Sequence, residues 1–194
     1  MEEANLKTSF KAVVIGGSAG SLSVLFELLP ALKKDLRIAL ILVLHRKNSS
    51  DSALSTLLAS KTLIPTKEVE EKEPVQYGCI YLAPADYHLL IEKDFTFSLD
   101  YSEKINFSRP SLDVTFESAA DVFGSELVAI ILSGANDDGT AGLSAVKQAG
   151  GFCIAQQPET AQMPFMPQHA IEHSEIDLIL SVKGMADFIN SINR

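Results

Sequence analysis

The stretch Gly-Gly-Ser-Ala-Gly at residues 16–20 has residue types and a spacing that could do chemistry. It matches the G-x-S-x-G pattern, in which small residues permit a tight turn that presents a serine hydroxyl at the end of a strand. Backbone N–H groups at the start of the following helix could stabilise an oxyanion. The pattern therefore points to Ser18 as a nucleophile, although glycine-rich turns between a strand and a helix also serve purely structural roles.

Two phosphate-binding motifs use a similar turn, and the sequence matches neither. A dinucleotide fingerprint, G-x-G-x-x-G, needs glycine where this chain has Ser18, at the point of closest approach to the pyrophosphate. A Walker loop needs G-K-[ST], which does not follow.

The elements around Ser18 must place its reaction partners. Uninterrupted apolar runs at 13–15, 38–44 and 127–132 are typical of buried parallel strands. Further strands are predicted at 79–83, 152–155 and 176–180, and a hairpin at 88–92 and 95–100. Helices are predicted at 21–29, from a cap at Ser50 or Asp51 to near Ser60, from a cap at Ser111, up to Gln148, at 168–172 (a short one) and at 186–192. Residues 61–78 are predicted to be a solvated edge or loop, and residues 163–167 an irregular segment. This alternation predicts an α/β fold, a doubly wound and mostly parallel sheet with helices on both faces and a small β-hairpin. We expect residues 1–10 to be a lead-in and residues 11–194 to form a single domain.

Polar residues follow three of these strands at the same edge of the sheet. Ser18 follows the first strand, His45 the second, and the pair Asp137-Asp138 the run that ends at Leu132. In such sheets, sites form beyond the carboxyl ends of the strands. A serine, a histidine and an aspartate there could act as nucleophile, general base and orienting acid. Spacing alone does not choose between the two aspartates.

Three other histidines allow alternatives. Ser18, Asp138 and His169 would follow the chain order of α/β-hydrolases, but in that fold several strands usually precede the nucleophile. Residues 169–173 match H-x-x-E-H, yet no third metal ligand stands out after His173. His88 lies in the expected hairpin, where we expect a structural role.

Composition narrows the class of protein. The chain has 194 residues, of which 46% are hydrophobic and 21% charged, and a net charge of -9 argues against nucleic-acid binding. Cys79 and Cys153 are isolated in apolar runs, so we expect two buried free thiols in a reducing compartment. We see no signal peptide and no run of apolar residues long enough to insert into a membrane, so we expect a cytoplasmic protein.

Taken together, the motifs resemble the catalytic domain of the chemotaxis-receptor protein-glutamate methylesterases, the CheB type. The resemblance extends from about Lys11 to about Leu180. In chain order it is carried by residues 14–20 (Val-Ile-Gly-Gly-Ser-Ala-Gly), 43–46 (Val-Leu-His-Arg), 81–88 (Tyr-Leu-Ala-Pro-Ala-Asp-Tyr-His), 109–114 (Arg-Pro-Ser-Leu-Asp-Val), 131–139 (Ile-Leu-Ser-Gly-Ala-Asn-Asp-Asp-Gly) and 166–167 (Met-Pro).

The resemblance implies a triad of Ser18, His45 and Asp138, with backbone support for the oxyanion from Ala19 and the Ala135 region. It implies hydrolysis of glutamate methyl esters on receptor signalling helices, deamidation of certain receptor glutamines, and no cofactor or metal. The implied partners are methylated receptors, with a methyltransferase or a separate regulator.

The chain departs from the family pattern in three ways. It carries no receiver domain, so we expect either constitutive activity or control by another protein. Ala19 stands where many members have a hydroxyl residue, and Ala135 where a methionine is common. Backbone roles survive both changes. A non-catalytic adaptor that keeps the fold, or an esterase for small molecules, remains as an alternative.

Overall fold

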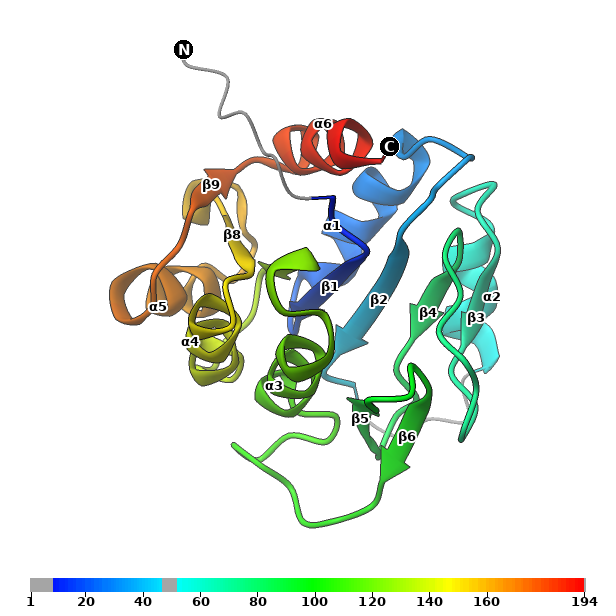
Figure 1. Cartoon of the computed structure of the whole chain (residues 1–194). Helices are drawn as coiled ribbons and strands as arrows, with labels where there is room; N and C mark the ends of the chain where they lie inside the picture. Colours follow the sequence, from blue (N-terminus) through cyan, green and yellow to red (C-terminus); the bar gives the residue numbers. More distant parts are fainter. Residues whose placement is uncertain (1–8, 47–51, 194) are drawn as a thin grey trace.

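A parallel β-sheet forms the centre of the molecule in the computed structural model, which describes residues 9–46 and 52–193 (Figure 1). Within these residues the sheet has seven strands in the order β3-β4-β2-β1-β7-β8-β9, and every neighbouring pair is parallel. The strands are β1 (Ala12–Gly17), β2 (Ala39–Leu44), β3 (Thr66–Glu68), β4 (Ile80–Leu82), β7 (Leu127–Ile131), β8 (Phe152–Gln156) and β9 (Leu178–Leu180). A separate antiparallel hairpin pairs β5 (His88–Ile91) with β6 (Phe97–Asp100).

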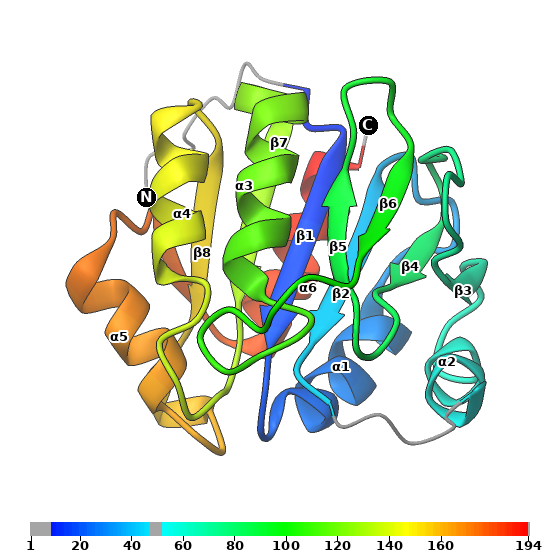
Figure 2. The same cartoon turned by 90° about the horizontal axis from the view of Figure 1, so that it is seen from below.

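Helices cover both faces of this sheet (Figure 2). The helices are α1 (Ser21–Leu28), α2 (Ser52–Ala59), α3 (Leu112–Phe123), α4 (Thr140–Gln148), α5 (Phe165–His173) and α6 (Val182–Ile192), with short 3₁₀ turns at Leu29–Ala31, Gly124–Glu126 and Pro158–Thr160. Apolar residues of α1, α2 and α6 share one core cluster with the sheet. Those of α3, α4, α5 and the hairpin form the other cluster, on the opposite face. The doubly wound α/β fold predicted from the sequence is confirmed.

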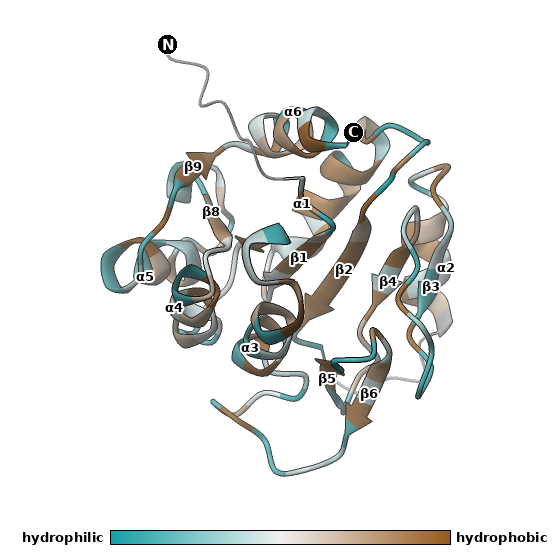
Figure 3. Ribbon diagram, in the orientation of Figure 1, coloured by the Kyte–Doolittle hydropathy of each residue, from teal (hydrophilic) through white to brown (hydrophobic). Residues whose placement is uncertain are grey.

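The central strand shows why the apolar runs are uninterrupted. Val13 and Ile15 of β1 point into the core under α1 and α6, whereas Ala12 and Val14 point into the core under α3 and α4. Because successive side chains of a strand face opposite sides of the sheet, a strand covered on both faces must be apolar at every position. Figure 3 shows the same pattern as continuous brown along the neighbouring strand β2.

Three elements differ from the sequence prediction. A short strand, β3, lies within 61–78, at the edge of the sheet. The helix α5 begins at Phe165, so the prediction of an irregular segment at 163–167 is wrong. Pro167 falls in the first turn of α5, where its missing N–H has no helical acceptor, so it does not break the helix. The last helix begins at Val182 rather than at 186, because the Ser181 hydroxyl caps it by accepting the Gly184 N–H at 3.2 Å.

Both cysteines are free, but only Cys153 is buried, and Cys79 is half-buried. Burial raises the pKa of the Cys153 thiol to about 12. No helix in the described part of the chain is long and apolar enough to cross a membrane. The predicted caps Ser50 and Asp51, and residues 1–8 of the expected lead-in, lie outside the described residues.

Candidate active site

The sheet brings the turns that follow β1, β2 and β7 together at one edge. Gly17 at the end of β1 is in register with Leu44 at the end of β2. His45 donates its backbone N–H to the Gly17 carbonyl at 3.0 Å, and Ser18 donates its own to the Ser133 carbonyl, just after β7, at 2.9 Å. The predicted convergence of the three polar clusters at the carboxyl edge is therefore confirmed for the backbone.

Ser18 occupies the turn between β1 and α1, in the strand–turn–helix setting that its motif requires. Gly20 makes the turn possible with a φ of 82°, in the left-handed region that favours glycine. The buried Ser133 hydroxyl donates to the Ala19 carbonyl at 2.7 Å and fixes the turn to β7. The side chain of Ser18 is half-buried, and its hydroxyl makes no hydrogen bond to any described residue.

The His45 ring contacts only one of the two candidate aspartates. Its Nε2 lies 2.7 Å from Oδ2 of Asp138, and the two side chains are 10% and 0% exposed. Asp137 is exposed instead. The geometry thus selects Asp138 as the carboxylate that can orient His45.

Asp138 is held at the N-terminus of α3. Besides His45, its carboxylate accepts the backbone N–H of Leu112 at 2.7 Å and of Asp113 at 3.2 Å, the hydroxyl of Ser111 at 2.9 Å and the side-chain amide of Asn106 at 3.3 Å. Burial alone would raise the pKa of Asp138, but the hydrogen bonds from His45 and the Leu112 N–H outweigh it and lower the pKa below 3.8. Ser111 is the N-cap residue of α3, as predicted, but its side chain makes no capping hydrogen bond: the hydroxyl donates to Asp138, and this carboxylate accepts the first N–H groups of the helix.

Asp113, in the first turn of α3, accepts backbone N–H groups at the N-terminus of α4 and so caps that helix. Its Oδ1 accepts the N–H of Gly139 at 2.9 Å and of Gly142 at 2.7 Å, at the N-terminus of α4. The aspartate before α4 therefore caps α3, and the aspartate in α3 caps α4. Burial raises the pKa of Asp113 to about 6, and the negative charge of Asp138 adds to this rise. Sequence analysis assigned Asp113 no role, because a cap between two helices leaves no local pattern.

The second ring nitrogen of His45, Nδ1, also has a polar contact. Ser108, in the loop between β6 and α3, has its hydroxyl 3.3 Å from Nδ1. A cleft of about 540 Å³ opens here, and it is lined by His45, Arg46, Asp86, Lys104, Phe107, Ser108 and Arg109. Figure 2 shows the green loop from β6 to α3 passing in front of β1 and β2. Sequence analysis did not identify Ser108, which lies in a loop without periodicity or motif.

Two further predicted positions fit a backbone role. Ala19 and Ala135 are both exposed, and each follows the end of a strand by a few residues. Their N–H groups donate to no described residue. Backbone donors without a partner are the groups that an oxyanion site requires.

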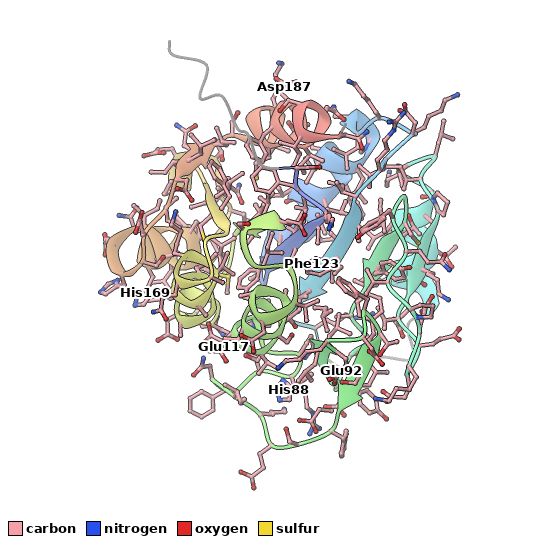
Figure 4. The ribbon with its side chains drawn as sticks, in the orientation of Figure 1. His88, Glu92, Glu117, Phe123, His169 and Asp187 are labelled. Carbon is pink, nitrogen blue, oxygen red and sulfur yellow. The ribbon has the colours of Figure 1, made fainter. Side chains whose placement is uncertain are left out.

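The remaining histidines lie apart from this pair. His88 is fully buried; its Nδ1 accepts the Ser111 N–H at 3.1 Å and its Nε2 lies 2.9 Å from the Glu103 carbonyl, which fits the expected structural role. His169 lies on α5, well away from His88 (Figure 4), and contacts the Thr140 hydroxyl at 3.0 Å. The alternative triad through His169 is therefore wrong, because Asp138 is paired with His45.

The H-x-x-E-H segment on α5 forms a compact pair of rings. His169 and His173 stack with ring centroids 4.1 Å apart. Among the described residues, no group of three or more His, Cys, Asp or Glu side chains is placed to hold a metal ion.

Comparison with known proteins agrees with this geometry. A family profile described as CheB methylesterase matches residues 13–189. A putative protein-glutamate methylesterase/protein-glutamine glutaminase of Leptospira interrogans is 43% identical over 179 residues, which cover 92% of this chain and 93% of the relative. The protein-glutamate methylesterase/protein-glutamine glutaminase of Thermotoga maritima is 37% identical over 89% of this chain and 51% of its own length.

A solved structure shows the same fold. The crystal structure of the Thermotoga maritima CheB methylesterase catalytic domain superimposes with a TM-score of 0.90 at 34% sequence identity, covering 95% of this chain and 100% of the other. With a matching family profile over most of its length and a homologous structure of the same topology, this chain belongs to the CheB methylesterase family.

Proposed function

We propose that this chain is a serine hydrolase that removes methyl esters from glutamate side chains of chemotaxis or other sensory receptors. Ser18 is the nucleophile, His45 the general base and Asp138 the acid that orients the base. The observation that carries the proposal is the 2.7 Å contact between His45 and the buried Asp138, beside the turn that presents Ser18. The relatives are named protein-glutamate methylesterases, which supports the choice of substrate.

The reaction follows from the side chains. The Ser18 hydroxyl attacks the ester carbonyl and gives its proton to His45, which then protonates the departing methanol. Water attacks the resulting acyl-serine in the same way and releases the glutamate carboxylate. Asp138 fixes the ring of His45 and stabilises its cation; because Asp138 has a lowered pKa, it is ionised at neutral pH.

The developing oxyanion needs hydrogen-bond donors that are already in place. The backbone N–H groups of Ala19 and Ala135 have no partner among the described residues. Ala19 follows Ser18 directly, and Ala135 comes two residues after Ser133, whose carbonyl accepts the Ser18 N–H. We assign the oxyanion to these two groups. Removing one such donor typically costs a factor of about 10²–10³ in kcat.

Methanol release from a methylated receptor fragment tests the proposal. Wild-type protein should release methanol, and Ser18→Ala should release almost none. The matched control is Ser23→Ala, an exposed serine on α1. Failure of the wild-type protein to release methanol from any methylated receptor would contradict the methylesterase assignment and favour a non-catalytic sensory adaptor.

Deamidation of receptor glutamines is a second candidate activity. The relatives are also named protein-glutamine glutaminases, and a primary amide offers the same carbonyl to Ser18 with ammonia as the leaving group. Ammonia release from an unmethylated, glutamine-containing receptor fragment, lost in Ser18→Ala, is the expected result.

The same proposal extends to the bounds of the catalytic domain and to the cellular compartment of the protein. We propose that residues 11–194 form one catalytic domain. The two free cysteines favour the reducing cytoplasm, where the signalling segments of membrane receptors are accessible.

A further inference from the structure

An exposed turn in the loop between β6 and α3 contacts His45 and Asp138, two of the side chains that the proposed reaction uses. Residues 101–107 of the loop between β6 and α3 are all exposed, and Phe107 is 97% exposed. Asn106 and Phe107 have φ values of 51° and 60°, in the left-handed region that side chains other than glycine seldom adopt. The fold thus holds a bulky apolar ring out in water, in an unfavourable backbone conformation, at the rim of the cleft.

The two neighbours of Phe107 in the chain contact His45, Asp138 and Asp113. The Asn106 amide donates to Oδ2 of Asp113 at 2.9 Å and to Oδ1 of Asp138 at 3.3 Å. The Ser108 hydroxyl lies 3.3 Å from Nδ1 of His45. A displacement of Phe107 would therefore be felt at both His45 and Asp138.

The turn is built to move as a unit. Ile105 and Ser108 exchange two backbone hydrogen bonds, at 3.2 and 2.9 Å. The base of the loop is fixed by Arg109, which donates to the carbonyls of Tyr101 and Ser102 at 3.2 and 2.7 Å. Arg109 also forms an ion pair with Asp86 at 2.8 Å. The carbonyl of Glu103 is also held, 2.9 Å from Nε2 of the buried His88. These contacts leave residues 104–108 as the part that can shift.

The contact of Ser108 occupies the lone pair that the reaction needs. Nε2 of His45 faces the buried carboxylate of Asp138, so Nε2 carries the ring proton and Nδ1 keeps the lone pair. The Ser108 hydroxyl lies 3.3 Å from Nδ1 and 3.3 Å from the Asn106 carbonyl, so it has two acceptors for its one proton. When it donates to Nδ1, it occupies the atom that must accept the Ser18 proton. Ser18, meanwhile, has no side-chain hydrogen bond to any described residue.

We propose that residues 106–108 form a latch that the substrate opens. An apolar side chain of the methylated receptor segment covers Phe107, the turn shifts, Ser108 leaves Nδ1, and the Ser18 hydroxyl takes its place. Phe107 is then the residue that recognises the receptor segment, and Ser108 is a positioning residue that keeps His45 occupied until the segment arrives. This inference rests on the proposed function for the identity of the substrate.

Covalent labelling of Ser18 by a small fluorophosphonate tests the latch without a receptor, since the probe needs only Ser18 and a free His45. Ser108→Ala should increase the labelling rate by about two- to tenfold, the range expected for losing one neutral hydrogen bond. The control Ser102→Ala, an exposed serine at the base of the same loop, should label at the wild-type rate. Unfolding temperatures of all variants show that each is folded.

Phe107→Ala separates recognition from chemistry. It should lower kcat/KM for the methylated receptor fragment about tenfold, and leave labelling by the small probe unchanged. The control Leu63→Ala removes another apolar side chain, 85% exposed and outside this cleft, and should leave both readouts unchanged.

Two results would overturn the latch: labelling of Ser108→Ala at or below the wild-type rate, or equal receptor hydrolysis by Phe107→Ala and wild-type protein. These failures differ from failure of the proposed function. There, the wild-type protein labels at Ser18 but releases no methanol, and the labelling rates still test Ser108.

Discussion

The acid end and the nucleophile end of the candidate site are built very differently. Asp138 is fully buried and accepts five hydrogen bonds, two of them from the backbone of α3. Ser18 is half-buried on an open turn, and its hydroxyl has no hydrogen-bond partner among the described residues. One end is part of the core, and the other only borders it.

The difference shows where stability and reactivity are separated in this fold. A carboxylate that caps a helix cannot be removed without loosening that helix, so its role in catalysis and its role in folding coincide. A hydroxyl without partners contributes nothing to the core, so it is free to react. The four predictions that follow test this contrast.

The largest effect on activity and stability together is expected from Asp138→Asn. In one orientation the new amide would place its NH₂ group against both Leu112 N–H and His45 Nε2, which share Oδ2, and in the other orientation against Asp113 N–H. Activity should fall by about 10³–10⁴, and the free energy of unfolding by about 3 kcal/mol. Methanol release and urea unfolding measure the two losses. Asp137→Asn, at the exposed neighbouring aspartate, should change neither.

Gly142→Ala should destabilise the acid end without removing a polar group. A Cβ at this position would lie 2.7 Å from the Phe116 Cβ and 2.9 Å from the Asp113 Cα, so α3 and α4 would have to separate. We expect a loss of about 2 kcal/mol in urea unfolding. At Gly184 in α6, a Cβ meets nothing closer than 3.4 Å, and Gly184→Ala should be neutral or stabilising. Equal losses for the two variants would show that helix contact is not the cause.

The pH dependence of stability should reveal Asp113. Its pKa rises from 3.8 in the unfolded chain to about 6 in the fold, so the folded state binds this proton more tightly. The resulting stabilisation is fully present below a pH of about 4 and is lost as the pH rises through about 6. Asp113→Asn should lack this slope between pH 4 and 7, measured as the free energy of unfolding against pH. Asp121→Asn, at an exposed position of the same helix, should keep it.

The smallest effect on stability is expected where the effect on activity is greatest. Ser18→Ala removes a hydroxyl that bonds to no described residue, so the free energy of unfolding should change by less than about 0.5 kcal/mol. Thermal and urea unfolding of the inactive variant give the measurement. A clear loss of stability would mean that Ser18 belongs to the core after all, and would remove the contrast with Asp138.

The sequence predicted the part of the site that strands position. Periodicity located the ends of β1, β2 and β7, and a parallel sheet then places Ser18, His45 and the aspartate pair at one edge. From the residues alone, Asp137 and Asp138 could not be told apart, because neighbouring residues of a turn point in different directions that spacing does not encode.

The site residues that could not be predicted, Asp113 and Ser108, make their contacts with segments that are distant in the sequence. Asp113 caps Gly139 across a separation of 26 residues, whereas capping patterns in a sequence operate over three or four. Ser108 reaches His45 from an irregular loop, 63 residues along the chain. Such residues carry no local signal, and only the folded chain shows their partners.

The exchange of caps between α3 and α4 also limits how this domain can be recombined. Each helix takes the acceptor for its first N–H groups from the other, so neither beginning can be replaced alone. Consider a chimera of this chain and a relative, with the junction between residues 113 and 138. Its two carboxylates, Asp113 and Asp138, then come from different proteins and have not been selected together. A junction before Asn106 or after Gly142 would keep Asp113, Asp138 and the Asn106 amide that contacts both of them in a segment from one parent.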